Sequence, residues 1–375
     1  MKRYIADHIF RDLGRKMVLL SGPRQVGKTF LANQLAERFK SHQYLNYDSL
    51  DDAQIIQDRT WSVVSDFLIL DEIHKMRGWK RFLKGAVDTK PHNQAVLVTG
   101  SARLDTFRQS GESLAGRYFP FHLHPLSVRE LADQIKPADA LDQLNRLGGF
   151  PEPFLSGSET EAVRWRNQYY SDLIREDILE ISRIREIRSM RLLVELLRKR
   201  VGSPLSLASI STSLQIAPNT VRSYIDILES LHVIFLIRPF HVNVARAIQK
   251  IPKVYFYDTG YVVGDEGVRL ENTVAVSLNK HAAYMRDVLG KNISINYVQT
   301  KDKKEVDFSL VESERLTTLI EVKLSDSKPS KNLLFLADKL NVPISYQLVQ
   351  NIRQPQSVGT THVVSAADWL AGLEA

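Results

Sequence analysis

The first third of the chain alternates short apolar runs with amphipathic stretches. The apolar runs occupy residues 17–20, 44–48, 66–70 and 95–100. Most of them are continuous rather than alternating, which is typical of strands that are buried on both faces. The stretches between them have apolar residues at helical spacing. This pattern predicts an α/β fold in which a parallel sheet is sandwiched by helices.

The pattern changes after residue 130. Residues 131–182 have mainly helical spacing and are interrupted by the Gly/Pro-rich segment 147–154, which indicates a helical lid or linker. Residues 183–204 set seven Lys and Arg against two Glu, a local basic excess on a predicted helix.

Residues 206–240 predict a short helix, a turn, a second helix and a strand, which is a winged-helix pattern. The inward positions of the second helix are Val221, Ile225, Leu228 and Leu231. The residues on its exposed face are Asn219, Arg222, Ser223 and Asp226. They include one arginine, which is few for a helix that recognises DNA bases. Contact with DNA and a purely architectural role both remain open.

The last third becomes β-like again, with candidate strands at 254–258, 293–299, 306–311 and 317–323. We therefore expect four segments. They are a core at 1–130, a helical lid or linker at 131–182, a winged-helix-like domain at 183–245, and a C-terminal α/β domain at 246–375.

Composition narrows the class of protein. The 375 residues are 43% hydrophobic and 25% charged, as in ordinary globular proteins, and they include no cysteine. A disulfide framework is therefore excluded, and we expect a cytoplasmic protein without a signal peptide or membrane span. The formal charge of +7 is compatible with a polyanionic partner, but an evenly solvated basic surface explains it equally well.

The sharpest motif is GPRQVGKT at residues 22–29, which lies between a predicted strand and a predicted helix. Its spacing matches a phosphate-binding loop, in which glycines turn several backbone N–H groups toward an anion at a helix N-terminus. Lys28 is expected to reach the terminal phosphates, and Thr29 to offer its hydroxyl to Mg²⁺. The expected nucleotide-binding residues are Gly22, Pro23, Arg24, Gln25, Val26, Gly27, Lys28, Thr29 and Phe30.

Two further strands end in polar residues. The apolar run 66–70 is followed by Asp71 and Glu72, and the run 95–100 by Ser101. Carboxyl ends of parallel strands are where ligands of open α/β sheets bind. We expect Asp71 to hold Mg²⁺ and Glu72 to orient and deprotonate the attacking water. Ser101 is expected to sense the terminal phosphate, or else simply to cap the next helix.

Five segments together resemble the prokaryotic AAA-type ATPases that carry a C-terminal domain of unknown function. They are GPRQVGKT, FLILDEIHKMRGWKRFLK, VLVTGSAR, SLAGRYFPFHLHPLS and LGGFPEPF, and the resemblance runs from about Phe10 to beyond Lys323. It implies a five-stranded sheet with the AAA+ strand order and Ser101 at the sensor strand. Arg117 resembles an arginine finger of this family, which usually acts from a neighbouring subunit, although a surface arginine in a turn would look the same.

The C-terminal segments KKEVDFSLV and TTLIEVKLS resemble the D…E-x-K core of restriction-endonuclease-like domains. This resemblance implies a site made of Asp307, Glu321 and Lys323, with Glu271 on the first core helix. Such a set could bind Mg²⁺ and activate water. Alternating charged residues on a solvent-facing strand would produce the same sequence pattern by chance. A domain with this fold can also bind a ligand without cleaving it.

The expected function is ATP hydrolysis with ATP and Mg²⁺, coupled to a C-terminal region that contacts nucleic acid. The expected partners are ATP and DNA, with a homo-oligomer if Arg117 acts in trans. The alternatives are a nucleotide-dependent switch that signals through protein contacts, and a metal-dependent DNA nuclease.

Overall fold

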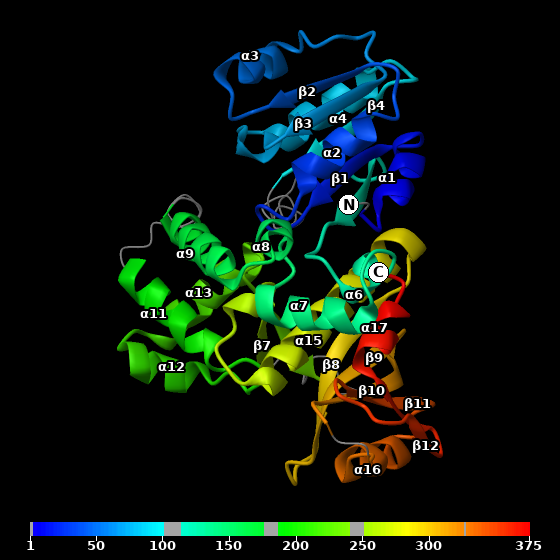
Figure 1. The fold of residues 1–375 in the computed structure, drawn as a ribbon. Coiled ribbons are helices and arrows are strands. Elements are labelled where there is room, and N and C mark those ends of the chain that lie inside the picture. The colour runs from blue at the N-terminus through cyan, green and yellow to red at the C-terminus, as the bar shows by residue number, and fades with distance from the viewer. Residues whose placement is uncertain (1–2, 101–113, 176–186, 241–250, 326–327) are drawn as a thin grey trace. The chain divides into compact units, whose positions relative to one another are not determined.

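The computed structural model describes residues 3–100, 114–175, 187–240, 251–325 and 328–375, which fall into two compact units (Figure 1). Unit 1 consists of Met1–His124 with the short segments Ser230–His232 and Asp287–Leu289. Unit 2 consists of Pro125–Glu229, Val233–Arg286 and Gly290–Ala375. The finer division into four segments stays a prediction.

Unit 1 is built on a five-stranded sheet with all neighbouring strands parallel, in the order β2-β3-β4-β1-β5. The strands are β1 (Met17–Ser21), β2 (His42–Asn46), β3 (Phe67–Asp71), β4 (Ala95–Thr99) and β5 (Tyr118–His122). Every residue of β1, β3 and β4 is buried, as continuous apolar runs predict. The predicted parallel α/β sheet is thereby confirmed.

Helices connect these strands and cover the sheet (Figure 1). They are α1 (Ala6–Leu13), α2 (Lys28–Ala36), α3 (Leu50–Asp58) and α4 (Trp79–Thr89), with a short 3₁₀ turn at Ile73–Lys75. One core cluster joins α3, α4 and the sheet through Ile56, Leu68, Leu83 and Val98. Burial of this apolar surface fixes α4 against the sheet by one face.

Strand β2 ends two residues earlier than the apolar pattern suggests. Ser49 caps α3 by accepting from the N–H of Asp52, and the Asp52 carboxylate accepts from the N–H of Asn46. These bonds draw residues 47 and 48 into the turn before α3. The cap therefore decides the strand end, rather than the apolar character of Tyr47.

Unit 2 begins with helices. They are α6 (Val128–Leu131), α7 (Pro137–Leu147), α8 (Pro151–Ser156), α9 (Glu159–Arg175), α11 (Ile187–Arg198), α12 (Leu207–Leu214) and α13 (Pro218–Ser230). Only the part of the basic stretch from Ile187 onward lies within the described residues. In α13 the residues Val221, Ile225 and Leu228 are buried as expected.

An eight-stranded mixed sheet completes unit 2, in the order β12-β13-β11-β10-β9-β8-β6-β7. Its strands are β6 (Ile234–Pro239), β7 (Lys253–Phe256), β8 (Ile293–Gln299), β9 (Glu305–Glu312), β10 (Arg315–Lys323), β11 (Ile344–Val349), β12 (Gln356–Val358) and β13 (Thr361–Ser365). Strands β8, β9 and β10 are antiparallel neighbours, whereas β10, β11 and β13 are parallel. Thus a helical region followed by a mixed sheet forms the C-terminal two-thirds.

Within the described residues, this sheet is accompanied by α15 (Glu266–Leu289), α16 (Lys331–Lys339) and α17 (Ala366–Ala371). Helix α16 contacts β9, β10, β11 and β13. The chain order α15-β8-β9-β10-α16-β11 places a long helix before three antiparallel strands and a second helix before a parallel one. No helix in the described part of the chain is long and apolar enough to cross a bilayer.

A buried ion pair ties the helical region of unit 2 to the segment after β7. Arg166 of α9 donates from Nε to Asp258 Oδ2 at 2.7 Å, and it also donates to the backbone oxygen of Leu147. Both charged side chains are at most 5% exposed. Removing one partner of such a pair leaves the other charge desolvated and uncompensated.

We therefore expect Asp258→Ala to lower the free energy of unfolding by about 3–5 kcal/mol in a urea titration. Glu161→Ala is the matched control, because Glu161 forms an exposed pair with Arg164 on the same helix. It should cost less than about 1 kcal/mol. Equal small losses for both variants would contradict a stabilising role of the buried pair.

Candidate functional site

The loop between β1 and α2 has three residues with positive φ. They are Gly22 (φ 149°), Gln25 (φ 57°) and Gly27 (φ 98°), and the helix begins directly afterwards at Lys28. A Cβ on Gly22 would lie 2.3 Å from the backbone oxygen of Leu123, so this position has no room for a side chain. The sequence therefore turns the backbone tightly and delivers it to a helix N-terminus, the arrangement that binds anions.

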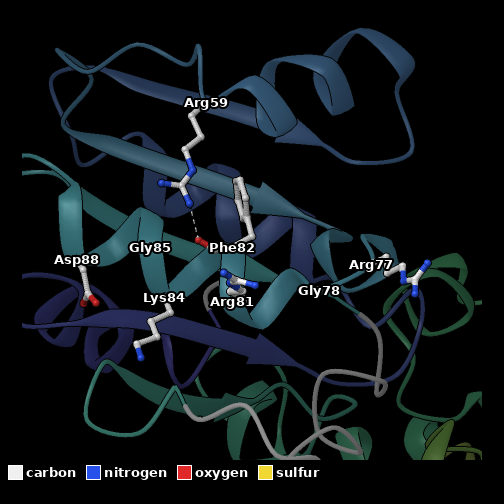
Figure 2. Close-up of a pocket in the computed structure, with 8 residues that line it drawn as sticks. All are labelled: Arg59, Arg77, Gly78, Arg81, Phe82, Lys84, Gly85 and Asp88. Atoms are coloured by element: carbon white, nitrogen blue, oxygen red, sulfur yellow. Dashed lines mark hydrogen bonds between the residues drawn. The ribbon is translucent and has the colours of Figure 1, made fainter.

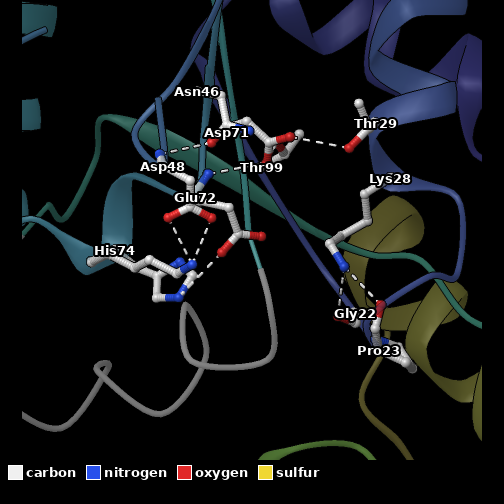
Figure 3. A network of polar contacts seen from close by, with 11 residues as sticks. Gly22, Pro23, Lys28, Thr29, Asn46, Asp48, Asp71, Glu72, His74 and Thr99 are labelled. Atoms are coloured by element: carbon white, nitrogen blue, oxygen red, sulfur yellow. Dashed lines mark hydrogen bonds and ion pairs between the residues drawn. The ribbon is translucent and has the colours of Figure 1, made fainter. Parts of the chain in front are cut away.

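Lys28 and Thr29 follow this loop on the first turn of α2. The Lys28 ammonium donates to the backbone oxygens of Gly22 at 3.0 Å and Pro23 at 2.7 Å, so its buried side chain folds back over the loop (Figure 3). Val26 is fully buried and anchors the loop, whereas Thr29 and Phe30 are exposed. The backbone of the loop thus fixes the position of the Lys28 ammonium.

Asp71, at the end of β3, is surrounded by hydroxyl groups. Its Oδ2 accepts from Tyr44 at 2.6 Å and from Thr29 at 3.0 Å, and its Oδ1 accepts from Thr99 at 2.5 Å. Figure 3 shows Thr29 reaching this carboxylate from α2. The structure therefore brings Thr29 and Asp71 together, as the two motifs predict.

Tyr44 and Thr99 were not predicted from the sequence. Both belong to strands that flank β3, and Thr99 pairs with Asp71 in the sheet register. Burial, followed by the hydrogen bond to Asp71, raises the pKa of the Tyr44 phenol far above its usual value. In the sequence, the available signal for these two partners of Asp71 was a hydroxyl-bearing residue within each strand that neighbours β3.

Glu72 has a left-handed backbone (φ 55°), which is uncommon for a residue with a side chain. Its carboxylate Oε2 lies 3.5 Å from Nε2 of His74, whose side chain is almost fully buried (Figure 3). Burial raises the pKa of Glu72, and the nearby charge of Lys28 opposes that rise. His74, like Tyr44 and Thr99, was not predicted from the sequence.

The two remaining predicted residues of unit 1 are Ser101 and Arg117. Ser101 lies outside the described residues. Arg117 forms a two-point ion pair with Asp88 of α4, with Nε at 2.8 Å from Oδ1 and Nη2 at 3.0 Å from Oδ2. This pair lowers the pKa of Asp88.

The four C-terminal residues come from α15 and the β9–β10 hairpin. Phe308 is opposite Ile320, which brings Asp307 and Glu321 to adjacent positions on neighbouring strands. The Lys323 ammonium lies 2.8 Å from Glu321 Oε1, and the Asp307 carboxylate accepts from the N–H of Val322 at 2.8 Å. The expected hairpin therefore brings this part of the set together.

Glu271 belongs electrostatically to the same cluster. Burial, then the charge of Asp307, raises the pKa of Glu271 to about 7, and the same causes raise that of Glu321 to about 7. The Tyr255 hydroxyl donates to Glu271 at 2.7 Å. A Cβ on Gly202 would lie 2.7 Å from the Glu271 carboxylate, so a glycine there leaves room for it.

Lys253 of β7 is a further member that the sequence did not suggest. It is buried, and its ammonium lies 2.5 Å from Glu305. Burial lowers its pKa, but the charges of Glu271, Asp307 and Glu305 outweigh burial and raise it. Across the described residues, no group of three or more His, Cys, Asp or Glu side chains is arranged to hold a metal ion.

Family comparison gives two matches. Residues 14–132 match an AAA domain, and residues 138–265 match a domain of unknown function. Uncharacterized proteins of Mycobacterium tuberculosis and Mycobacterium bovis are each 30% identical over 264 residues. These alignments cover 69% of this chain and 58% of each relative, so the chain spans less than two-thirds of their length.

Two archaeal proteins are also similar. An uncharacterized protein of Methanocaldococcus jannaschii is 25% identical over an alignment of 396 positions, and the alignment covers 89% of this chain and 80% of that protein. A Walker-type ATPase of Pyrococcus abyssi superposes with a TM-score of 0.46 at 16% identity, over 71% of this chain and 96% of that one.

The family match, the parallel sheet and the loop before α2 agree on the N-terminal part. An AAA P-loop domain implies ATP as its ligand, typically with Mg²⁺. Residues 14–132 are an AAA domain of the P-loop type, and a C-terminal domain of unknown function follows at residues 138–265.

Proposed function

We propose that this protein binds ATP with Mg²⁺ through residues 22–30 and hydrolyses it. The observation that carries the proposal is the meeting of two elements at one sheet edge. The loop before α2 holds Lys28, and the end of β3 holds Asp71 beside Thr29 with Glu72 next in the chain. A phosphate cradle and a carboxylate pair at one edge suit transfer of a phosphoryl group to water.

The side chains present fit the ligand. Backbone N–H groups of residues 24–30 and the Lys28 ammonium would bind the phosphates. Thr29 and Asp71 would hold Mg²⁺, which prefers oxygen donors and few protein ligands. Mg²⁺ supplies neutralisation of charge on the phosphate oxygens when it is bound.

Glu72 is the proposed general base, which orients the attacking water and accepts its proton. Its raised pKa strengthens it as a proton acceptor, because a weaker acid has a more basic carboxylate. His74 is a proposed positioning residue, since its buried ring contacts the Glu72 carboxylate.

Ser101 and Arg117 are proposed to complete the site. Ser101 follows β4, the strand next to β3, and would sense the terminal phosphate. Arg117 would neutralise charge on the transferring group of a neighbouring copy in a homo-oligomer. To do so it must leave Asp88, its partner within one chain.

Gly22→Ala tests the loop geometry. The added Cβ meets the Leu123 oxygen, so the loop must open and the amides diverge, and we expect ATP affinity to fall at least about tenfold. Fluorescence of a labelled ATP analogue measures this. Gly14→Ala is the matched control, because Gly14 has an ordinary φ of −71° and a Cβ there would meet its nearest atom at 3.5 Å. Unchanged affinity in Gly22→Ala would refute the cradle.

Glu72→Gln separates hydrolysis from a nucleotide-dependent switch. The amide cannot accept the proton of water, so we expect phosphate release to fall by about 10²–10⁴-fold while ATP stays bound. Glu37→Gln, at the exposed end of α2, is the control. If the wild-type protein retains ATP without releasing phosphate, the proposal of ATP hydrolysis is wrong and the protein is a nucleotide-dependent switch.

A second candidate function, cleavage of a phosphodiester, rests on the C-terminal cluster. The side chain of Glu321 is only 6% exposed, and its Oε2 atom is buried. This oxygen has no hydrogen-bond partner among the described residues. An unsatisfied buried carboxylate oxygen is costly and is an available ligand position. Asp307 and Glu321 would hold Mg²⁺ with the substrate phosphate, which needs fewer protein carboxylates than a closed metal cage. Lys323 would stabilise charge at the phosphate.

The chain order around this cluster supports a restriction-endonuclease-like interpretation of residues 246–375. Glu271 lies on α15, the helix before the antiparallel strands β8, β9 and β10. Of these strands, β9 carries Asp307, and β10 carries Glu321 and Lys323. A winged-helix interpretation of residues 183–245 rests on α12, α13 and the strand β6 that follows them. Asn219, Arg222, Ser223 and Asp226 are exposed on α13 and would face DNA.

Nicking of supercoiled plasmid with Mg²⁺ or Mn²⁺ tests this second function. Wild-type protein should nick, and Asp307→Asn and Lys323→Ala should each reduce nicking by at least about a hundredfold. Lys339→Ala, an exposed lysine of α16, should leave it unchanged. Absence of nicking by the wild-type protein with either metal would exclude the nuclease and leave the ATP site unaffected.

A further inference from the structure

A basic pocket lies along the solvent side of α4 in unit 1, and it shares no residue with the proposed ATP site. Its volume is about 800 Å³. Figure 2 shows the side chains that line it. The residues that line it are Arg59, Arg77, Gly78, Arg81, Phe82, Lys84, Gly85 and Asp88. We call this set the α4 basic pocket.

The sequence of α4 forces its cations outward. Trp79, Leu83 and Ala86 are buried on one face of the helix. Helical spacing then leaves Arg81, Lys84 and Asp88 exposed on the opposite side. Burial of the apolar face therefore fixes where the charges are displayed.

Arg59 is held in place from a different element. It ends α3 with a left-handed backbone (φ 55°), and its Nη2 donates to the backbone oxygen of Phe82 at 3.1 Å. Its guanidinium carbon lies 4.9 Å from the centre of the Phe82 ring. A Cβ on Gly85 would be 2.7 Å from the same Nη2, so a glycine at this position makes room for the arginine. The arginine therefore joins α3 to α4 as part of a built surface.

The charge of the pocket is strongly positive. Asp88 is the one acidic residue among the eight that line it, and Arg117 pairs with it at 2.8 and 3.0 Å. With Asp88 compensated in this way, four cationic side chains remain: Arg59, Arg77, Arg81 and Lys84. Four cationic side chains against one carboxylate among the residues that line the pocket attract a polyanion.

The shape of the pocket favours a chain of anions over a single small one. Arg77 precedes α4 by two residues, and Arg81 and Lys84 follow on the helix at intervals of four and then three residues. Because an α-helix rises by about 1.5 Å per residue, Arg81 and Lys84 are offset along its axis. A row of cations suits a repeating anion, whereas one phosphate would need donors that converge. Three of the four cations are arginines, whose planar forks bind phosphate oxygens at two points.

The lining also disfavours an acidic peptide. Peptides in grooves are anchored by apolar side chains, and Phe82 is the one large apolar residue among those that line the pocket. The guanidinium of Arg59 already lies over its ring. We propose that the α4 basic pocket binds the sugar-phosphate backbone of a nucleic acid strand, without reading its bases.

The test uses the full chain and short fluorescent oligonucleotides, single-stranded and duplex, with anisotropy measured from about 50 to about 200 mM salt. Arg81→Glu with Lys84→Glu removes two phosphate contacts. We expect affinity to fall at least about tenfold for both oligonucleotides, whatever their sequence, and the slope of log K against log salt to decrease by about 2.

The matched control is Lys16→Glu with Lys40→Glu, which changes the net charge of unit 1 equally outside the pocket. It should retain wild-type binding. ATP affinity should be the same in all three proteins, which separates this site from the proposed ATP site and reports folding of unit 1. Charge-preserving Arg81→Lys should leave the slope of log K against log salt unchanged, because the slope follows the number of phosphates neutralised.

Three outcomes would overturn the proposal. They are no binding of either oligonucleotide by the wild-type protein, equal losses in the two double variants, and loss of binding to polyglutamate in Arg81→Glu with Lys84→Glu while oligonucleotide binding is unchanged. The last result would identify an acidic protein partner instead.

Discussion

The turn of the backbone between β1 and α2 is the constraint on which the proposed ATP site depends. Gly22 packs against the backbone oxygen of Leu123, which directly follows β5, the strand beside β1. This close contact with the chain after β5 therefore restricts the conformation of the loop. Gly27 completes the turn with a positive φ just before the helix. Pre-set amides lose little conformational entropy on binding, which is how a short loop can hold a highly charged ligand.

The same sheet explains why the catalytic candidates come from distant parts of the sequence. Parallel strands end at a common edge, so Thr29 after β1, Asp71 at the end of β3 and Thr99 at the end of β4 meet there. The hydroxyls of Tyr44, Thr29 and Thr99 all bond to Asp71, which fixes the orientation of its carboxylate. In contrast, the acids of the C-terminal cluster repel each other through a poorly solvated interior, and lysines on two strands offset that repulsion.

Much of unit 1 was predictable, because continuous apolar runs and a phosphate-loop motif are strong local signals. The end of β2 was not, since a capping interaction of Ser49 outweighs the apolar pattern of residues 44–48. Tyr44, His74 and Thr99 were also missed, because their roles depend on which strands become neighbours, and local periodicity does not encode strand order. In unit 2, the candidate acids and the β9–β10 hairpin were accessible from the sequence, whereas Lys253 reaches the cluster through a strand 54 positions before Asp307 in the chain. The α4 basic pocket was likewise invisible, since Arg59 joins it from another helix.

The central claim is that the amides and Lys28 of residues 22–30 bind the phosphates of ATP. Titration calorimetry of ATP into the wild-type protein with Mg²⁺ present tests it most directly. We expect saturable heat with one ATP bound per chain, and a large loss of affinity when AMP replaces ATP. No heat from well-folded protein, or equal affinity for AMP, would contradict it.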